Sequence, residues 1–163
     1  MCSERTGGII EVSMRINDFS SEWMNCDRVS TFMARLVSQK SVDPMFHANL
    51  FSTALNELLE VVFFNHGPEG SFTCRVGRVG DVETIEIELP YDERTLNFYT
   101  GVLKTLDRPD VEELYQASLF EAGQVDARLG LLELAVDYKA KMSVLVAADQ
   151  LTLRAEIALG WVQ

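Results

Sequence analysis

The chain has 163 residues, of which 47% are hydrophobic and 24% are charged. This composition suits one globular domain with its own core and excludes a disordered chain, so we expect a single domain over residues 1–163. Asp and Glu outnumber Lys and Arg by 25 to 14, which gives a formal net charge of -11. A surface this negative repels phosphate backbones and anionic lipids, so nucleic acid and membrane surfaces are disfavoured as partners.

The cysteines and the first residues indicate a cellular compartment. Cys2, Cys26 and Cys74 are an odd number, are widely spaced and form no CxxC pair. They are typical of reduced thiols and not of a disulfide framework or a zinc site. The opening segment MCSERTGG lacks the apolar core of a signal peptide, and no apolar run approaches the ~20 residues that span a bilayer. The sequence therefore predicts a cytoplasmic protein.

The chain begins with a predicted strand and a predicted helix. Residues 8–16 mix β-branched and polar residues as a strand does. Apolar residues then recur at helical spacing over 27–40, and Asn25 or Asp27 is expected to cap this helix. A thiol near a helix N-terminus can have a lowered pKa, which applies to Cys26. Without a convergent histidine, however, a nucleophilic role for it is disfavoured.

A second helix is predicted to begin at Asp43-Pro44. The carboxylate accepts free backbone N–H groups, and proline supplies a helical φ at a position that needs no donor. This helix is apolar on most sides, which is typical of a central core helix. The segment Asn65-His66-Gly67-Pro68 is expected to end it.

Two strands are predicted next, over 72–79 and 82–89, with Gly80-Asp81 as a hairpin turn. In the second strand apolar residues alternate with glutamates, so one face is buried and the other is wet.

Helices are predicted again after Pro90. Asp92 is expected to cap a helix over 93–106. Asp110, with Glu113 three residues on, resembles a capping box and predicts a short helix that runs to about residue 121.

The last part of the chain predicts a loop over 123–128, a helix over 129–140 and a strand hairpin over 143–147 and 151–159. Helices therefore come in runs between antiparallel hairpins. This order predicts an α+β fold, a two-layer sandwich with helices on one face of a mostly antiparallel sheet.

The order of elements, centred on ALNELLEVVFFNH at 54–66, resembles the ATP-binding domain of histidine kinases and anti-sigma-factor serine kinases. The resemblance covers about residues 8–160. The segment SEWMNCDRVSTFMARL at 21–36 is also similar to a bacterial branch of this superfamily found beside signalling phosphatases. The resemblance implies a histidine-kinase-ATPase-like fold. In that family a helical glutamate orients water or a hydroxyl, and an asparagine four residues on holds Mg²⁺. An Asp-x-Gly-x-Gly loop holds the adenine, and a glycine-rich loop wraps the phosphates.

The sequence departs from each of these motifs. Glu57 falls at the position of the base, but Val61 replaces the asparagine, and valine cannot ligate Mg²⁺, which wants oxygen. Asp92 falls at the position of the adenine-binding aspartate, yet both glycines that follow it in the family are absent. The late loop, VDARLGLLELA, keeps only Gly130. The three losses together argue against an efficient kinase.

Each candidate site residue also has a structural interpretation. Glu57 is either a residual catalytic base or, with Glu60, the wet edge of an amphipathic helix. Glu60 or Asn56 would have to reach a metal in an active enzyme. Asp92 is either an adenine ligand or a helix N-cap, and the cap is favoured. Gly130 either belongs to a phosphate-binding loop or allows close packing at a helix start.

The histidines and tryptophans offer no further catalytic set. His47 and His66 lie near opposite ends of one predicted helix, about 28 Å apart at the helical rise, so they cannot share a metal. We expect both to be helix-terminal side chains, and no metal site is predicted. Trp23 and Trp161 would favour an interface if exposed, although burial under the chain ends is the simpler expectation.

The resemblance and the departures together predict a bacterial signalling regulator, a pseudo-kinase relative of the anti-sigma-factor serine kinases. It would bind an anti-sigma antagonist-type protein or a PP2C-type phosphatase in a partner-switching pathway. The acid-rich segment 107–126, which corresponds to the family's lid over ATP, would be a docking surface. The alternative is an active ATP-dependent protein serine kinase with unconventional metal ligands, which would bind ATP or ADP. A third is a homodimeric module with helix 47–64 at its interface.

Overall fold

The structure is a computed structural model that describes residues 9–121 and 126–159. Within them, five antiparallel strands form one sheet in the order β1-β2-β3-β5-β4, with helices against it. The strands are β1 (Ile10–Arg15), β2 (Ser71–Val79), β3 (Val82–Pro90), β4 (Lys141–Ala147) and β5 (Gln150–Ile157), and the helices are α1 (Ile16–Phe19), α2 (Met24–Ser38), α3 (Pro44–Phe64), α4 (Glu93–Leu106), α5 (Val111–Phe120) and α6 (Leu129–Val136). The predicted α+β class is confirmed.

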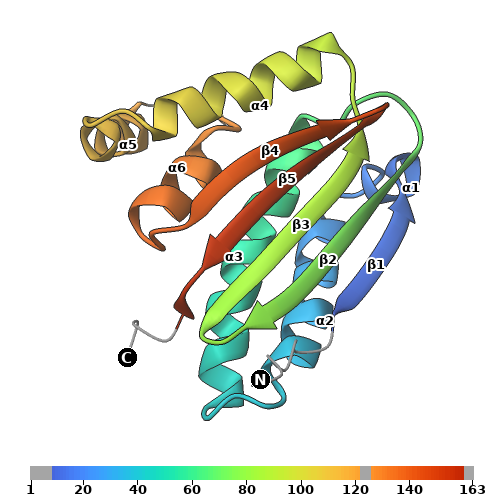
Figure 1. Ribbon diagram of the computed structural model, residues 1–163, viewed down its shortest axis with the longest axis vertical. Helices are drawn as coiled ribbons and strands as arrows, with labels where there is room; N and C mark the ends of the chain where they lie inside the picture. The colour runs from blue at the N-terminus through green and yellow to red at the C-terminus, as the bar shows by residue number, and fades with distance from the viewer. Residues whose placement is uncertain (1–8, 122–125, 160–163) are drawn as a thin grey trace, which may run out of the picture.

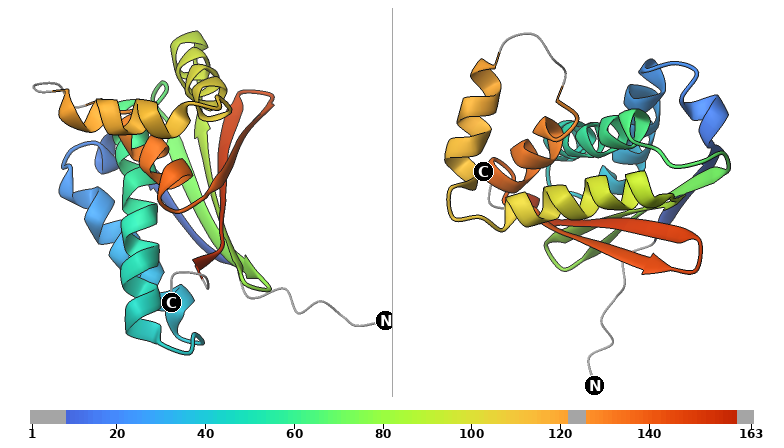
Figure 2. Two further views of the ribbon diagram at one scale, coloured as in Figure 1. Left: turned by 90° about the vertical axis from the view of Figure 1, so that its left-hand side faces the viewer. Right: turned by 90° about the horizontal axis from the view of Figure 1, so that it is seen from above.

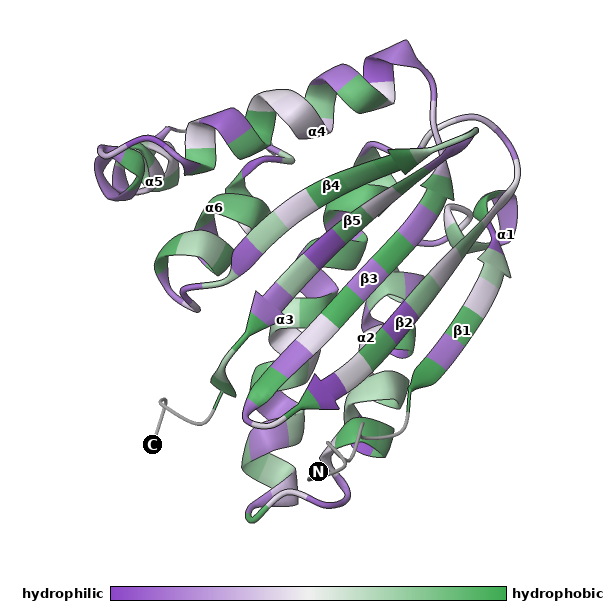
Figure 3. Cartoon of the chain, in the orientation of Figure 1, coloured by the Kyte–Doolittle hydropathy of each residue, from purple (hydrophilic) through white to green (hydrophobic). Residues whose placement is uncertain are grey.

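The sheet has one apolar face and one polar face, because side chains alternate along β2, β3 and β5 (Figure 3). The polar face carries a row of alternating charge across four strands. Arg75 pairs with Glu11 at 2.6 Å, and Arg154 pairs with Glu86 at 3.0 Å. Arg75 and Glu86 are register partners between the two pairs. Such cross-strand pairs favour this register and keep the outer face wet.

The apolar face of the sheet is covered by the helices, with α3 at the centre between α2 and α6 (Figures 1 and 2). Phe51, Leu55, Leu58 and Leu59 of α3 are fully buried. Because α3 has neighbours on several sides, many of its apolar residues are buried within the chain, as expected of a core helix, while Met45, Phe46 and Phe64 near its ends stay exposed. No helix in the described ranges combines the length and the apolar character that a membrane crossing requires.

Two of the predicted N-caps are confirmed, and a third helix, α5, begins where predicted but without its predicted capping bond. Asp43 caps α3 by accepting from Phe46 N at 3.0 Å, with Pro44 in the first turn. Asp92 caps α4. Asp110 makes no capping bond, so the predicted capping box is wrong. Its carboxylate instead accepts two hydrogen bonds from Arg108, at 2.8 and 2.7 Å.

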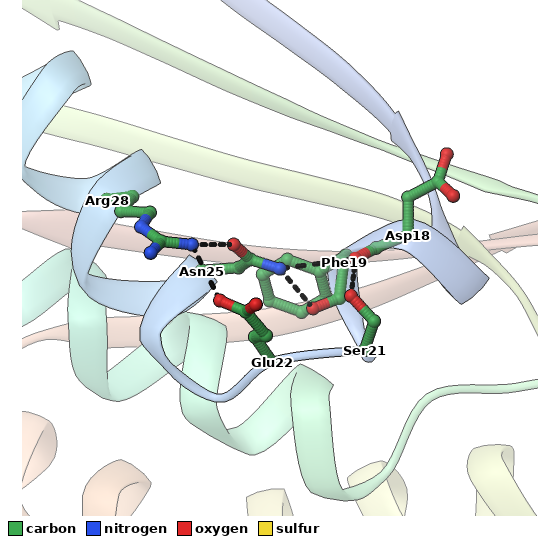
Figure 4. A network of polar contacts seen from close by, with 6 residues as sticks. All are labelled: Asp18, Phe19, Ser21, Glu22, Asn25 and Arg28. Atoms are coloured by element: carbon green, nitrogen blue, oxygen red, sulfur yellow. Dashed lines mark hydrogen bonds and ion pairs between the residues drawn. The ribbon is translucent and has the colours of Figure 1, made fainter.

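The start of α2 also differs from the prediction. The helix begins at Met24, without a side-chain cap, so neither Asn25 nor Asp27 is the cap. Asn25 donates from inside the first turn to the carbonyls of Asp18 and Phe19, at 3.2 and 3.0 Å (Figure 4). These carbonyls belong to α1, a short helix that the polar sequence after the first strand does not predict.

Helix α6 ends at Val136, earlier than the predicted helix over 129–140. Lys139 has a left-handed φ of 53°, and Ala140 N donates to Leu134 O at 3.0 Å. A residue with a left-handed φ ends a helix, and the hydrogen bond from Ala140 closes the turn that follows α6. Glycine is the usual residue at such a position, so a lysine there hides the helix end from the sequence.

The two described cysteines, Cys26 and Cys74, are free and buried, as expected of reduced thiols. Burial raises the pKa of each thiol to about 12. The lowered pKa considered for Cys26 is therefore wrong, because removal from water outweighs the helix N-terminus. Cys2, Trp161 and residues 123–125 of the expected loop lie outside the described residues.

Candidate functional site

A cleft of about 330 Å³ lies where the C-terminal half of α3 faces the start of α6. We call it the α3–α6 cleft. It is lined by Glu57, Glu60, Val61, Phe64, Asp126, Ala127, Leu129, Gly130 and Glu133. Three of the four predicted site residues therefore meet in one place, and only Asp92 lies outside the lining. The helix-forming sequence places Glu57 and Glu60 one turn apart on α3.

At Gly130, α6 lies close against α3. A methyl group at position 130 would stand 2.7 Å from Glu57 Oε2 and 3.4 Å from the Glu57 carbonyl oxygen. Any larger residue would have to displace the glutamate side chain. Of the two interpretations of this glycine, the geometry supports close helix packing, and the carboxylate stands where a phosphate-wrapping loop would need open space.

The electrostatics of the α3–α6 cleft are dominated by like charges. Burial, followed by the charges of Glu133 and Glu60, raises the pKa of Glu57 to about 7. Burial and neighbouring carboxylates also raise the pKa of Glu133. No Lys or Arg lines the cleft in the part of the chain that the structure describes. Arg128 lies between two lining residues in the sequence, and its guanidinium pairs with Asp126 at 2.9 Å.

The two residues that could reach a metal ion in the kinase alternative lie beside each other on α3. Glu60 Oε1 accepts from Asn56 Nδ2 at 2.7 Å, so the two residues proposed to reach a metal are bonded to each other. Val61, at the position of the family's asparagine, is only 2% exposed. Within residues 9–121 and 126–159, no three His, Cys, Asp or Glu side chains are arranged to hold a metal ion.

Asp92 is committed to helix α4. Its Oδ1 accepts from Thr95 N at 2.8 Å and from Thr95 Oγ1 at 2.7 Å. These hydrogen bonds lower the pKa of the Asp92 carboxyl. The geometry matches the favoured interpretation, an N-cap, and does not bring Asp92 to the cleft.

A buried polar network that the sequence reasoning missed lies at the other end of α3. His47 Nε2 is 2.8 Å from Glu83 Oε1, and His47 Nδ1 is 2.6 Å from Ser38 Oγ. Glu83 is only 1% exposed, and Arg78 Nε lies 3.4 Å from the same carboxylate oxygen. Burial raises the pKa of Glu83, while His47 and Arg78 oppose that shift. We call these four residues the His47–Glu83 network.

The sequence did contain a signal for this network. Glu83 has the inward phase of β3, two residues before the buried Ile85. A carboxylate in that phase needs a polar partner. His47 was expected only as a helix-terminal side chain, and its position does not reveal its role. The Ser-His-Glu order suggests a nucleophile, but Ser38 is only 1% exposed, so no substrate reaches it.

His66, the second histidine, lies beyond the end of α3, where its Nδ1 is 2.9 Å from Gly67 O. It makes no contact with His47, as expected from their separation along the helix. Trp23 is 56% exposed, so the expectation of burial under the chain end is wrong for this residue.

Comparison with known protein families, with characterised proteins and with solved structures finds no match for this chain. The function is therefore argued from the residues and the geometry above.

Proposed function

We propose that this protein is a non-catalytic signalling regulator that binds a protein partner, as a pseudo-kinase relative of the anti-sigma-factor serine kinases would. Its partner class would be an anti-sigma antagonist-type protein or a PP2C-type phosphatase. The observation that carries the proposal is the charge of the α3–α6 cleft, which has four lining carboxylates and no lining cation among the described residues.

The chemistry of nucleotide binding explains why this charge matters. A phosphate chain is held by backbone N–H groups, Lys, Arg or a bridging Mg²⁺. In the α3–α6 cleft the charged lining groups are carboxylates, and Glu57 Oε2 lies close to Gly130. Carboxylates at this density repel a triphosphate by Coulomb interaction in a partly buried site. A protein partner imposes no such requirement.

One observation favours the alternative function, an active protein serine kinase. A general base works best when its pKa is near the operating pH, and the pKa of Glu57 is about 7. In that reading Glu57 would accept the proton of the substrate hydroxyl, and ATP would bring its own Mg²⁺. Glu57→Gln would then abolish phosphate transfer and leave partner binding intact.

The test mixes the purified protein with an anti-sigma antagonist-type protein and, separately, with a PP2C-type phosphatase domain. Binding is measured by biolayer interferometry with and without Mg²⁺-ATP, and transfer of labelled γ-phosphate is followed in the same mixtures. We expect saturable binding to one partner that is indifferent to nucleotide, and no labelled protein. Nucleotide-dependent labelling that Glu57→Gln removes would overturn the proposal in favour of the kinase. Binding to neither protein would overturn the proposed partner class.

A further inference from the structure

The outer surface of α3 carries two hollows that meet at one residue. The α3–α6 cleft is the first. The second, of about 270 Å³, is lined by Trp23, Met24, Asp27, Asn56 and Glu60. Glu60 lines both, so the two hollows lie next to each other, and we call them together the α3 groove. Its floor is α3, its walls are the start of α2 and the start of α6, and α3 runs between these helices in both views of Figure 2.

Large apolar side chains lie open along the α3 groove. Trp23 is 56% exposed, Met24 is 55% exposed and Phe64 is 47% exposed. Trp23 and Met24 belong to the α2 wall, and Phe64 lies at the α6 side of the floor. Tryptophan and methionine are enriched where proteins bind one another, because they offer large contact areas that bury readily.

The wall that carries Trp23 is held in place by polar contacts (Figure 4). Ser21 Oγ donates to Asp18 O at 2.7 Å, and Asn25 Nδ2 donates to two carbonyls of α1. Arg28 Nη1 donates to Glu22 Oε2 at 2.8 Å and to Asn25 Oδ1 at 3.1 Å. The turn between α1 and α2 is thereby fixed on both sides of Trp23. A surface that is already ordered loses less conformational entropy when a partner binds.

The charged residues that line the α3 groove are all acidic, and one of them, Asp126, is paired with Arg128. Asp27 on the α2 wall joins the four carboxylates of the α3–α6 cleft, and no Lys or Arg lines either hollow among the described residues. The nearby guanidinium of Arg28 is already paired with Glu22. An occupant of this groove must therefore combine apolar side chains with positive charge.

We propose that the α3 groove binds a basic amphipathic segment of a partner protein, with its apolar side chains against Trp23, Met24 and Phe64 and its Lys or Arg side chains among the carboxylates. This inference rests on the proposed function and names the surface and the chemistry of recognition. A second copy of this chain fits poorly, because it would bring a net charge of -11 to a negative surface. Lipid headgroups and nucleic acids are disfavoured by the same repulsion.

The experiment uses the full chain with Trp161→Phe, so that Trp23 is the only tryptophan. The probe is a synthetic amphipathic peptide of leucine and lysine, about four helical turns long, and its counterpart has glutamate in place of lysine. We expect the lysine peptide to change Trp23 fluorescence saturably, with an affinity that falls as salt rises. We expect no change with the glutamate peptide. Equal responses to both peptides, or none to either, would overturn the inference.

A matched pair of variants separates the groove from the overall negative charge. Glu60→Lys reverses the charge at the centre of the groove, and Asp81→Lys makes the same change at the exposed β2–β3 turn near the opposite end of α3. We expect Glu60→Lys to weaken binding of the lysine peptide about tenfold or more and Asp81→Lys to change it less than about twofold. Equal losses would mean attraction by net charge alone, which overturns the inference.

The peptide assay and the phosphate-transfer assay fail independently. Labelling of a partner with ATP would refute the proposed non-catalytic function whatever the peptide does. If the lysine peptide leaves Trp23 fluorescence unchanged, the α3 groove is not the binding surface. The protein could then still be a protein-binding regulator that uses another surface. Sedimentation of the same sample adds a further outcome, because a dimer that protects Trp23 from the peptide would show a second copy as the occupant.

Discussion

Buried carboxylates have opposite electrostatic surroundings at the two ends of α3. Near its N-terminus, His47 meets Glu83 of β3 at 2.8 Å, with Arg78 beside the same oxygen. In its C-terminal half, Glu57 faces Glu133 and Glu60, and the pKa of Glu57 rises to about 7. The Glu83 carboxylate is buried beside two cationic or hydrogen-bonding partners of the same chain. The Glu57 carboxylate lies among other carboxylates in the α3–α6 cleft.

This difference separates a structural network from a binding site. Like charges held together cost folding free energy, which nothing within the cleft returns. Such an arrangement is common at functional sites, where the missing partner is a ligand. Glu83 has a histidine and an arginine beside its Oε1 within the chain, while its Oε2 is buried without a hydrogen-bond partner among the described residues. We therefore assign the His47–Glu83 network to stability and propose recognition for the α3–α6 cleft.

The largest effect on stability is expected from disruption of the His47–Glu83 network. His47→Leu leaves Glu83 buried with only the longer contact to Arg78, and we expect a loss of about 3–5 kcal/mol in the free energy of unfolding. Urea denaturation followed by circular dichroism measures it. The double variant His47→Leu with Glu83→Leu removes the charge together with its partner, so it should recover most of the loss. A single variant as stable as the parent would contradict a structural role for the pair.

A smaller effect probes the contact between α3 and α6. Gly130→Ala places a methyl group 2.7 Å from Glu57 Oε2, and we expect it to destabilise the protein by roughly 1 kcal/mol. In a Glu57→Ala background the obstacle is gone, and alanine should stabilise α6 by about 1 kcal/mol through its higher helix propensity. The reversal of sign in a double-mutant cycle is the measured quantity. The same sign in both backgrounds would mean that the two residues do not touch.

The pH dependence of stability tests the raised pKa of Glu57 in the α3–α6 cleft. The folded pKa of Glu57, about 7, is above its reference value of 4.5, so the folded state binds this proton more tightly than the unfolded state. The resulting stabilisation is full below about pH 4.5 and is lost as pH rises through about 7. We expect Glu57→Gln to reduce the loss between those values by on the order of 1 kcal/mol, after allowance for screening by water.

Denaturation of both proteins across this pH range provides the check. The groups facing Glu57 are Glu60 on α3, Glu133 on α6, and Tyr115 and Tyr138, whose pKa values are also raised in part by its charge. Glu133 has a raised pKa of its own, so part of the pH dependence should remain in the variant. Identical profiles for the parent and Glu57→Gln would contradict the assignment of a raised pKa to this residue.

The smallest effect is expected at the α2 wall of the α3 groove. Asn25→Ala removes the hydrogen bonds to the two α1 carbonyls, and we expect a loss of about 1 kcal/mol in the free energy of unfolding. Binding of the lysine peptide should weaken about threefold, because Trp23 would be less ordered before binding. Thr31→Ala, a half-buried position further along α2, is the control. An effect on stability with none on binding would show that the wall need not be held.

Local patterns were enough to predict much of the fold. Alternation along β3 gives its buried face, and Asp43-Pro44 gives the start of α3, because both depend on residues close in sequence. The inward phase of Glu83 was equally local and was overlooked. The lost cap at Asp110 was not predictable from the cap alone, since the outcome depends on competition from Arg108.

The candidate site was predictable only in part. Helical spacing places Glu57 and Glu60 on neighbouring positions of α3, and the family resemblance pointed to Gly130. That α6 packs onto this stretch of α3 is a long-range fact, and the raised pKa of Glu57 follows from that packing. Exposure of Trp23 likewise depends on contacts between α1 and α2 that no periodicity encodes.

The most direct test of the central claim is calorimetric titration of ATP and ADP, with and without Mg²⁺, into the purified protein. We expect no detectable heat of binding at millimolar nucleotide, because the α3–α6 cleft presents carboxylates to the phosphates. Micromolar binding that requires Mg²⁺ would contradict this expectation, and would mean that the acidic cleft recruits a metal ion despite Val61.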